Sequence, residues 1–516
     1  MPITPTYPGV YIEEVPSGVR PITGVATSIT AFVGRAWKGL LDEPVRIAGY
    51  GDYERKFGGL WRGSSMSYAV FQFFQNDGKD AIIVRVATRD PANAPAKATI
   101  DLGGGTILEA ASEGTWGKNL AVSVDHQTKD PTNASLFNLS IFDDRRIKED
   151  STKRGGSGDE EKFLNVSMLP NDPRFVTKVL QEQSQLVRVN TLGAARPAAA
   201  TRLPADLASG SDGIDITNAD IVGIEGDKTG IFALEKADLF NLLCIPPLTP
   251  GAEGTDVDLN TTWTAAATYC QKRRALLIVD APSSWNVDTA EQDITTFSTI
   301  ARENAALYFP RVHLADPLQE GQLDVFAPCG IIAGLMSRTD SARGVWKAPA
   351  GIEANLRGVS KLKVKMTDPE NGRLNPLGIN CLRTFEGIGT VCWGARTLMG
   401  QDILASEWKY VPIRRLALFL EESLFRGTKW VVFEPNDEPL WAKIRQNLNA
   451  FMMRLFRQGA FEGTTPDKAF YVKCDAETTT PADRNLGIVN IEVGFAPLKP
   501  AEFVIIRIKQ MASEGG

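Results

Sequence analysis

The stretch LNPLGINCLRTFEGIGTVCWGART, residues 374–397, mixes glycine and proline with apolar, strand-forming residues. Three other segments of the last third of the chain share this composition: GVWKAPAG (344–351), FEPNDEPLW (433–441) and GFAPLKPAEFVIIRIKQ (494–510). Glycine and proline among apolar residues suit strands that pair through their backbones and surfaces that pack closely. None of the four segments places a nucleophile beside a base or gathers ligands for a metal ion. They therefore indicate assembly rather than chemistry.

Length and charge narrow the class of protein. A chain of 516 residues contains roughly three or four domain-sized units. Its net charge of −6 argues against a general nucleic-acid binder, which would carry a basic surplus. No run approaches the roughly 18 apolar residues needed to cross a bilayer, and the first residues lack the basic and apolar regions of a signal peptide. We therefore expect no membrane insertion, and assembly in the cytoplasm.

The middle of the chain has the pattern of an α/β domain. Apolar runs at residues 238–245, 275–282 and 305–310 alternate with helix patterns at 262–273 and 289–304. Buried apolar strands separated by helices predict a mainly parallel, doubly wound sheet. An earlier set of the same kind predicts a strand through Phe32 and Val33, a helix over residues 66–75 and a strand over residues 80–87.

A β-rich insert interrupts this α/β pattern. Short alternating strands near residues 120–125, 136–142 and 163–168 are separated by glycine, aspartate and asparagine turns. The charged, glycine-rich stretch 143–162 is interpreted as a solvated loop. The chain is thus predicted to have five parts: an N-terminal arm (1–25), the first part of the core (26–90), the insert (91–210), an α/β domain (211–345) and a C-terminal α+β core (346–516).

Taken together, these motifs resemble those of contractile tail sheath proteins. That family forms the shrinking sleeve of contractile phage tails, R-type bacteriocins and phage-like injection particles. The four C-terminal segments are the most specific part of the resemblance, and others repeat it: PGVYIEEV (8–15), GTWGKNL (114–120), SGSDG (209–213) and residues 327–340.

The resemblance implies a structural protein without a cofactor. Its subunits would polymerise as a helical stack of six-membered rings around an inner tube, between a baseplate and a cap or terminator protein. Heterologous, non-closing contacts generate such a helix. The expected location is a phage virion tail or a bacterial contractile injection particle, and the sequence does not distinguish the two. The target cell, the cargo and the extended or contracted state also stay open.

The same resemblance implies a subtilisin-like middle domain, so a hydrolase is the alternative function. A Ser-His-Asp triad would have to use His313 with Asp316 and Ser283 or Ser284. No glycine-framed nucleophile elbow surrounds these serines, which favours a structural histidine. The glycine-rich stretches 114–119 and 223–230 lack the spacing of a phosphate loop and are interpreted as turns. The six cysteines are scattered and should be buried thiols. We predict no catalytic, cofactor or metal site.

Both ends of the chain carry predicted linking strands. The proline-flanked segment 8–15 has no local strand partner, and residues 502–509 alternate apolar side chains on two faces. Both fit addition to the sheet edge of a neighbouring copy. The residues predicted to make this linkage are Val10, Tyr11, Ile12, Val15, Phe503, Val504, Ile505, Ile506 and Ile508.

An amphipathic helix is predicted from about Asp437 to Gly459. At 100° per residue one broad face is apolar, and Lys443, Arg454 and Arg457 fall within an arc of about 60° on the other side. Such a basic face is ordinarily just solvated. Because sheaths present a helix of this core to the inner tube, the resemblance implies that these three residues contact acidic groups on the tube.

Overall fold

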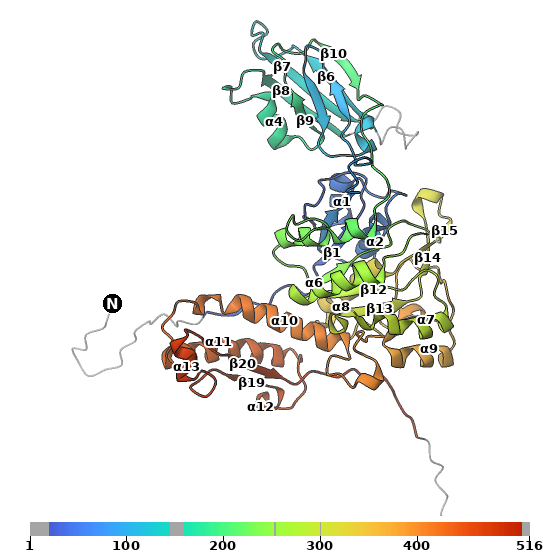
Figure 1. Ribbon diagram of the computed structural model, residues 1–516, viewed down its shortest axis with the longest axis vertical. Coiled ribbons are helices and arrows are strands. Elements are labelled where there is room, and N and C mark those ends of the chain that lie inside the picture. The colour runs from blue at the N-terminus through green and yellow to red at the C-terminus, as the bar shows by residue number, and fades with distance from the viewer. Residues whose placement is uncertain (1–19, 145–158, 252–253, 300, 508–516) are drawn as a thin grey trace, which may run out of the picture. The chain divides into compact units, whose positions relative to one another are not determined.

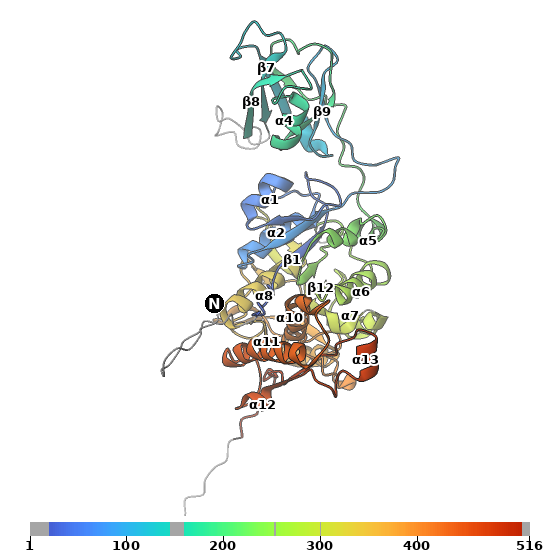
Figure 2. The same cartoon turned by 90° about the vertical axis from the view of Figure 1, so that its left-hand side faces the viewer.

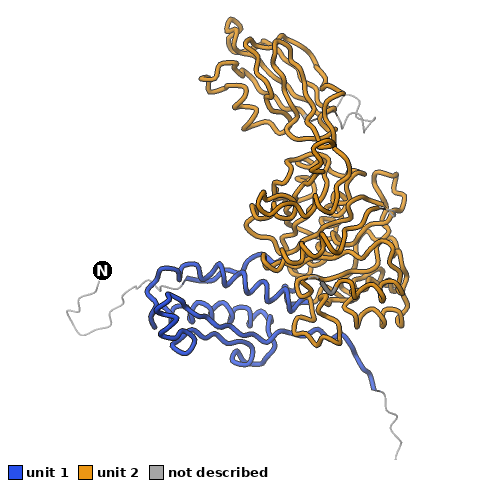
Figure 3. The backbone as a smooth tube through the Cα atoms, in the orientation of Figure 1, with its two compact units in different colours: residues 1–27, 343–347, 412–516 blue, residues 28–342, 348–411 orange. Residues whose placement is uncertain are grey.

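The computed structural model describes residues 20–144, 159–251, 254–299 and 301–507. These residues form two compact units (Figure 3). Unit 1 is built mainly from the chain after residue 412, together with residues 20–27 and 343–347, whereas unit 2 contains residues 28–342 and 348–411. Residues 348–411, which the sequence analysis grouped with the C-terminal core, thus belong to unit 2.

An eight-stranded sheet forms the centre of unit 2. Its strand order is β18-β17-β13-β12-β11-β1-β3-β2, with parallel pairing from β17 to β3 and antiparallel pairing at both edges. The prediction of a mainly parallel sheet is confirmed. The strands are β1 (Thr30–Gly34), β2 (Val45–Ile47), β3 (Ala81–Arg85), β11 (Leu242–Cys244), β12 (Leu276–Asp280), β13 (Ala305–Phe309), β17 (Ile379–Phe385) and β18 (Gly389–Cys392).

Helices cover both faces of this sheet (Figures 1 and 2). One face packs against α6 (Thr264–Lys272) and α7 (Val287–Asp293) in a single apolar cluster. On the other face Phe32 contacts Phe73 of α2 (Ser65–Gln75), with ring centroids 5.5 Å apart. The remaining helices of unit 2 are α1 (Tyr50–Phe57), α4 (Val176–Gln183), α5 (Asn218–Val222), α8 (Cys329–Arg343) and α9 (Asp368–Leu374).

Two glycines let α8 approach α2 closely. A Cβ atom on Gly330 would lie 2.1 Å from the carbonyl oxygen of Ala69, and one on Gly334 would lie 2.6 Å from that of Phe73. No side chain fits in such a space. The glycines of the stretch 327–340 therefore serve helix packing.

The insert has its own apolar core and two sheets. One sheet has the order β10-β6-β7-β8 and the other β4-β5-β9, and α4 packs beside β9 (Figure 1). The predicted strands are found with small shifts in their ends. The insert strands are β4 (Thr99–Asp101), β5 (Ile107–Ala110), β6 (Leu120–Asp125), β7 (Leu136–Asp143), β8 (Asp159–Ser167), β9 (Val187–Thr191) and β10 (Ala200–Pro204). Most of the predicted loop lies outside the described residues.

Unit 1 is a pair of long helices with a small sheet. Helices α10 (Val411–Gly427) and α11 (Glu438–Arg457) pack through Phe419 and Phe451, and the antiparallel pair β19 and β20 lies beside α11 (Figure 1). The small sheet consists of β19 (Phe470–Lys473) and β20 (Glu492–Phe495), and the short helices are α12 (Pro466–Ala469) and α13 (Pro481–Asn485).

The predicted helix over residues 289–304 is wrong beyond Asp293. Helix α7 ends at Asp293, and tight 3₁₀ turns follow at Ile294–Thr299 and Arg302–Asn304. The run ITTFST combines β-branched residues with hydroxyl side chains. Hydroxyls compete for backbone hydrogen bonds and β-branched residues lose rotamer freedom in a helix, so the α-helix does not continue.

Candidate functional site: assembly surfaces

Asp316 and Ser283, two candidates for a hydrolase triad, have hydrogen-bond partners other than His313. His313 lies in β14 (Val312–Ala315), where burial and two nearby lysines lower its pKa. Asp316 accepts a hydrogen bond from the hydroxyl of Tyr68 at 3.0 Å. The backbone nitrogen of Ser283 donates to Asp256 at 2.7 Å. Among the described residues no hydrogen bond joins the side chain of His313 to Asp316, Ser283 or Ser284.

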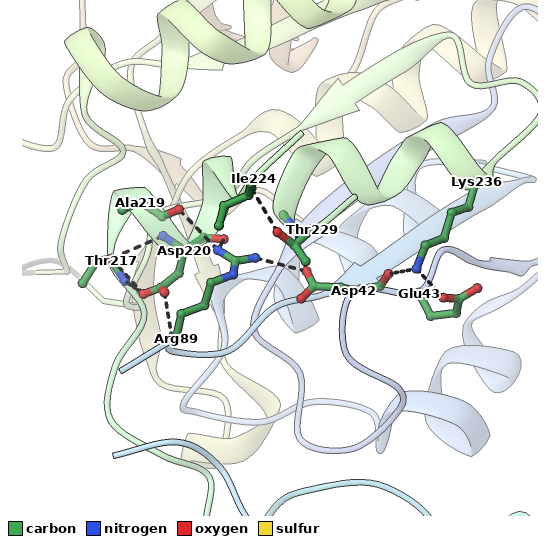
Figure 4. A network of polar contacts seen from close by, with 10 residues as sticks. Asp42, Glu43, Arg89, Thr217, Ala219, Asp220, Ile224, Thr229 and Lys236 are labelled. Carbon is green, nitrogen blue, oxygen red and sulfur yellow. Dashed lines mark hydrogen bonds and ion pairs between the residues drawn. The ribbon is translucent and has the colours of Figure 1, made fainter. Parts of the chain in front are cut away.

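The glycine-rich loop at residues 223–230 is occupied by the protein's own groups (Figure 4). The backbone nitrogen of Gly230 donates to Oδ1 of Asp42 at 2.7 Å, and that of Ile224 donates to the hydroxyl of Thr229 at 2.9 Å. A carboxylate at this position would repel a phosphate. The interpretation of this stretch as a turn is confirmed.

The other glycine-rich stretch, residues 114–119, contacts the segment in which the chain leaves the insert. Residues Thr115–Asn119 form a 3₁₀ turn, and Asp212 accepts hydrogen bonds from the backbone nitrogen and the hydroxyl of Thr115 at 2.8 and 2.6 Å. Asp212 belongs to the stretch 209–213 that leaves the insert, so this contact ties the 3₁₀ turn to the exit of the insert.

All six cysteines are free and buried, as predicted. Across the described part of the chain, no three His, Cys, Asp or Glu side chains come together as a metal-binding group. None of the helices in that part is both long and apolar enough to span a membrane.

Helix α11 forms as its sequence predicts. The side chain of Asp437 caps it by accepting a hydrogen bond from the backbone nitrogen of Leu440, and Gly459 follows its end with a φ of +77°. Its predicted apolar face is at most 4% exposed, namely Trp441, Ile444, Leu448, Phe451, Met452 and Leu455. Burying six such side chains fixes α11 against the rest of unit 1.

The three basic residues of this face of α11 differ in their contacts within unit 1. Lys443, Arg454 and Arg457 are all exposed. Arg454 also donates from Nη2 to the backbone oxygen of Ile22 at 2.8 Å, and its guanidinium lies 5.4 Å from the ring centre of Phe451. Arg454 therefore has a structural role within unit 1 that helix periodicity did not indicate.

The C-terminal segment is apolar and exposed. The side chains of Phe503, Val504, Ile505 and Ile506 are 71–81% exposed. Their backbone, described up to Arg507, is in no strand. Val10, Tyr11, Ile12, Val15 and Ile508 lie outside the described residues. The predicted linkage therefore stays a prediction, although an exposed apolar run is the form that such a strand would take before pairing.

A small sheet that the sequence analysis did not predict lies in the same unit. Strands β19 and β20 pair from Phe470 opposite Phe495 to Lys473 opposite Glu492, and the sheet has two strands within the described residues. An isolated two-stranded sheet is only marginally stable in water, so it depends on neighbours. The alternation of Phe470 with Val472, and of Val493 with Phe495, was the available signal.

Two family models match adjacent parts of the chain. The phage tail sheath protein central domain matches residues 215–398, and the phage tail sheath C-terminal domain matches residues 405–511. Together they cover more than half of the chain. This chain belongs to the phage tail sheath family.

Curated relatives agree with membership of the sheath family. A tail sheath protein of Vibrio phage KVP40 is 30% identical over 181 residues, which are 34% of this chain and 25% of that protein. A prophage major tail sheath protein of Pseudomonas aeruginosa, itself described as putative, is 25% identical over 291 residues, 56% of this chain and 70% of that protein. The match thus spans only a quarter of the length of the Vibrio phage sheath.

Solved sheath structures share the fold over nearly the whole chain. The anti-feeding prophage helical sheath in its contracted state has a TM-score of 0.58 at 22% identity, covering 98% of this chain and 100% of that one. A sheath tail protein from Listeria innocua has a TM-score of 0.61 at 14% identity, covering 93% of this chain and 96% of that one. At these identities the likeness concerns the fold alone.

Proposed function

We propose that the chain is the structural subunit of a contractile sheath, which polymerises into a helical sleeve around an inner tube and drives that tube forward by contraction. Family membership supports this function. The observation that carries it is the C-terminal segment, whose apolar side chains at residues 503–506 are 71–81% exposed in the single chain. Leaving such a segment in water is unfavourable unless a partner covers it.

The linking strands would join copies through the small sheet of unit 1. Backbone groups along the edges of a two-stranded sheet can pair with added strands. Residues 8–15 of one copy and residues 503–508 of another have the apolar alternation for this role. Because each contact joins different surfaces of two copies, repeated contacts build a ring where the rotation closes and a helix where it does not.

The basic face of α11 would hold the inner tube through Lys443 and Arg457, with Arg454 as the third contact. Exposed ion pairs contribute only about 0–1 kcal/mol each. Repeated around every ring they would keep sheath and tube in register, yet release during contraction. This part of the proposal rests on the exposure of the three residues on one face.

Partners and location follow from the proposed sheath. Rings of six subunits would stack between a baseplate and a cap or terminator protein, in a particle assembled in the bacterial cytoplasm. The α/β part of unit 2 would be a subtilisin-like domain used for packing, and the family argues for a structural protein over a hydrolase. The insert would form the outer surface of the particle. A phage virion tail and a host-encoded injection particle both fit.

Truncation tests the function. Removal of residues 502–516, or of residues 1–19, should leave a soluble protein with an unchanged melting temperature. Co-expressed with its tube and baseplate proteins, either truncated chain should form no sheath in electron micrographs, whereas the full chain should form long tubes. Sheaths of normal length from either truncation would refute the linking strands. Failure of the full chain to polymerise, together with turnover of an acyl substrate, would favour the hydrolase.

A further inference from the structure

Residues 20–27 lie against unit 1 without regular secondary structure. Ile22 is 3% exposed and belongs to the same apolar cluster as Leu416, Leu420 and Trp441. The guanidinium of Arg20 lies 5.1 Å from the ring centre of Trp430. This short segment, at the end of the N-terminal arm, is therefore packed onto both long helices.

Side chains of the helices bind the backbone of this segment. The oxygen of Ile22 accepts from Arg454 of α11 at 2.8 Å. From α10, the hydroxyl of Ser423 accepts a hydrogen bond from the backbone nitrogen of Val25 at 3.2 Å. Arg415 donates to the backbone oxygen of Thr27 at 3.0 Å. Peptide groups of an extended chain need such partners when no neighbouring strand supplies them.

Two glycines fix the position of the segment along the helices. A Cβ atom on Gly24 would lie 2.8 Å from the ring of Phe419, and one on Gly427 would lie 2.7 Å from the side chain of Ile22. A shift by one residue would bring the side chain of Thr23 or Val25 against the ring of Phe419, which would then have to move. The contacts with α10 and α11 thus favour the observed register of residues 20–27.

We propose that these contacts with α10 and α11 anchor the N-terminal arm and that Arg454 is the positioning residue that holds it there. The inference rests on the proposed function, because an anchor matters only if the preceding residues link copies. An anchor at residues 20–27 sets the point from which the preceding residues extend, so it limits which neighbouring copy they can meet.

The position of Arg454 also connects the arm to the proposed tube contact. Arg454 shares its face of α11 with Lys443 and Arg457. A guanidinium that binds the Ile22 oxygen has further N–H donors for an acidic group on a tube. The residue therefore serves the arm in the free subunit and can serve the tube as well.

A matched pair of variants tests the anchor. Arg454→Ala and Arg457→Ala each remove one positive charge from the same face of α11, but only the first removes a hydrogen bond to the arm. In the free subunit, hydrogen exchange of a peptide covering residues 20–27 should become about tenfold faster in Arg454→Ala, since a charged hydrogen bond is lost. Exchange in Arg457→Ala should equal that of the wild type.

A second variant changes Gly427, the residue of α10 that faces Ile22. Gly427→Val places a side chain against Ile22 and should also release residues 20–27. Both releasing variants should give short or broken sheaths on tubes, where the wild type gives sheaths of normal length. Equal exchange in Arg454→Ala and Arg457→Ala would overturn the anchor. Released arms with normal sheaths would overturn its role in linking copies. Because exchange is measured on free subunits, a failure of the proposed function would appear separately, as no polymer from the wild type.

Discussion

Two apolar runs of similar composition meet opposite environments in this molecule. The residues of β13, AALYF, are at most 1% exposed between two parallel neighbours in unit 2. The residues FVII at 503–506 are 71–81% exposed in unit 1. Unit 2 completes its own sheet, whereas unit 1 has two paired strands and an apolar segment left over. This difference supports the proposal that unit 2 folds by itself and that other copies complete unit 1.

The largest expected effect separates these two roles. Leu277 of β12 is fully buried, so Leu277→Ala should lower the free energy of unfolding by about 2–5 kcal/mol. The matched variant Ile505→Ala, at an exposed position, should change it by less than about 0.5 kcal/mol yet weaken polymerisation. Denaturant melts of free subunits, with sedimentation of the polymer, check both. A comparable loss of stability from Ile505→Ala would mean that unit 1 already buries this segment.

The pH dependence of stability, through the buried carboxyl of Asp280, tests the proposal that unit 2 folds by itself. Burial raises the pKa of Asp280, at the end of β12, to about 6, above the usual 3.8, although Cys329 donates its backbone N–H to Oδ1 at 2.9 Å. The folded state therefore binds more protons than the unfolded state between pH 4 and 6, and this group's contribution to stability falls as the pH rises through that range.

Asp280→Asn removes this pH dependence. The unfolding free energy of the variant minus that of the wild type should rise by about 2 kcal/mol between pH 4 and pH 7, and stay constant above. Urea melts at matched pH values measure it, with Asp288→Asn, a change at an exposed carboxylate, as the control. A difference that does not vary with pH would show that the Asp280 pKa is ordinary.

A smaller effect per subunit concerns the tube. Lys443→Glu with Arg457→Glu avoids Arg454 and so leaves the arm contact intact. The free subunit should fold with an unchanged melting temperature, because exposed pairs contribute about 0–1 kcal/mol each. Summed over the lattice, the reversed charges should prevent extended sheaths on tubes, while empty or contracted sheaths still form. Normal extended particles in electron micrographs would remove this face from the tube contact.

The smallest effect is expected in the insert. Shortening the charged stretch 153–159 should leave both melting temperature and sheath length unchanged, because such loops lie away from essential contacts. Loss of polymerisation in electron micrographs would instead place this loop at an interface between copies.

Sequence patterns predicted the elements whose formation depends on residues close together in the chain. The parallel strands were visible as continuous apolar runs, and α11 as a capped helix of period 3.6. The pairing of β19 with β20 was missed because each strand has only four residues. The contact of Arg454 with Ile22 joins residues 432 positions apart and involves a backbone oxygen, which no pattern encodes. Residues 348–411 likewise join unit 2 through the pairing of β17 with β13, a long-range contact that sequence patterns do not show.

Hydrogen exchange along the C-terminal segment tests most directly whether unit 1 is completed by other copies. Backbone amides of residues 503–507 are in no strand of the single chain and should exchange within seconds in free subunits. In assembled sheaths the account predicts protection of alternate amides by at least about a hundredfold, together with new protection along β19 or β20. Fast exchange of residues 503–507 in intact sheaths would contradict it.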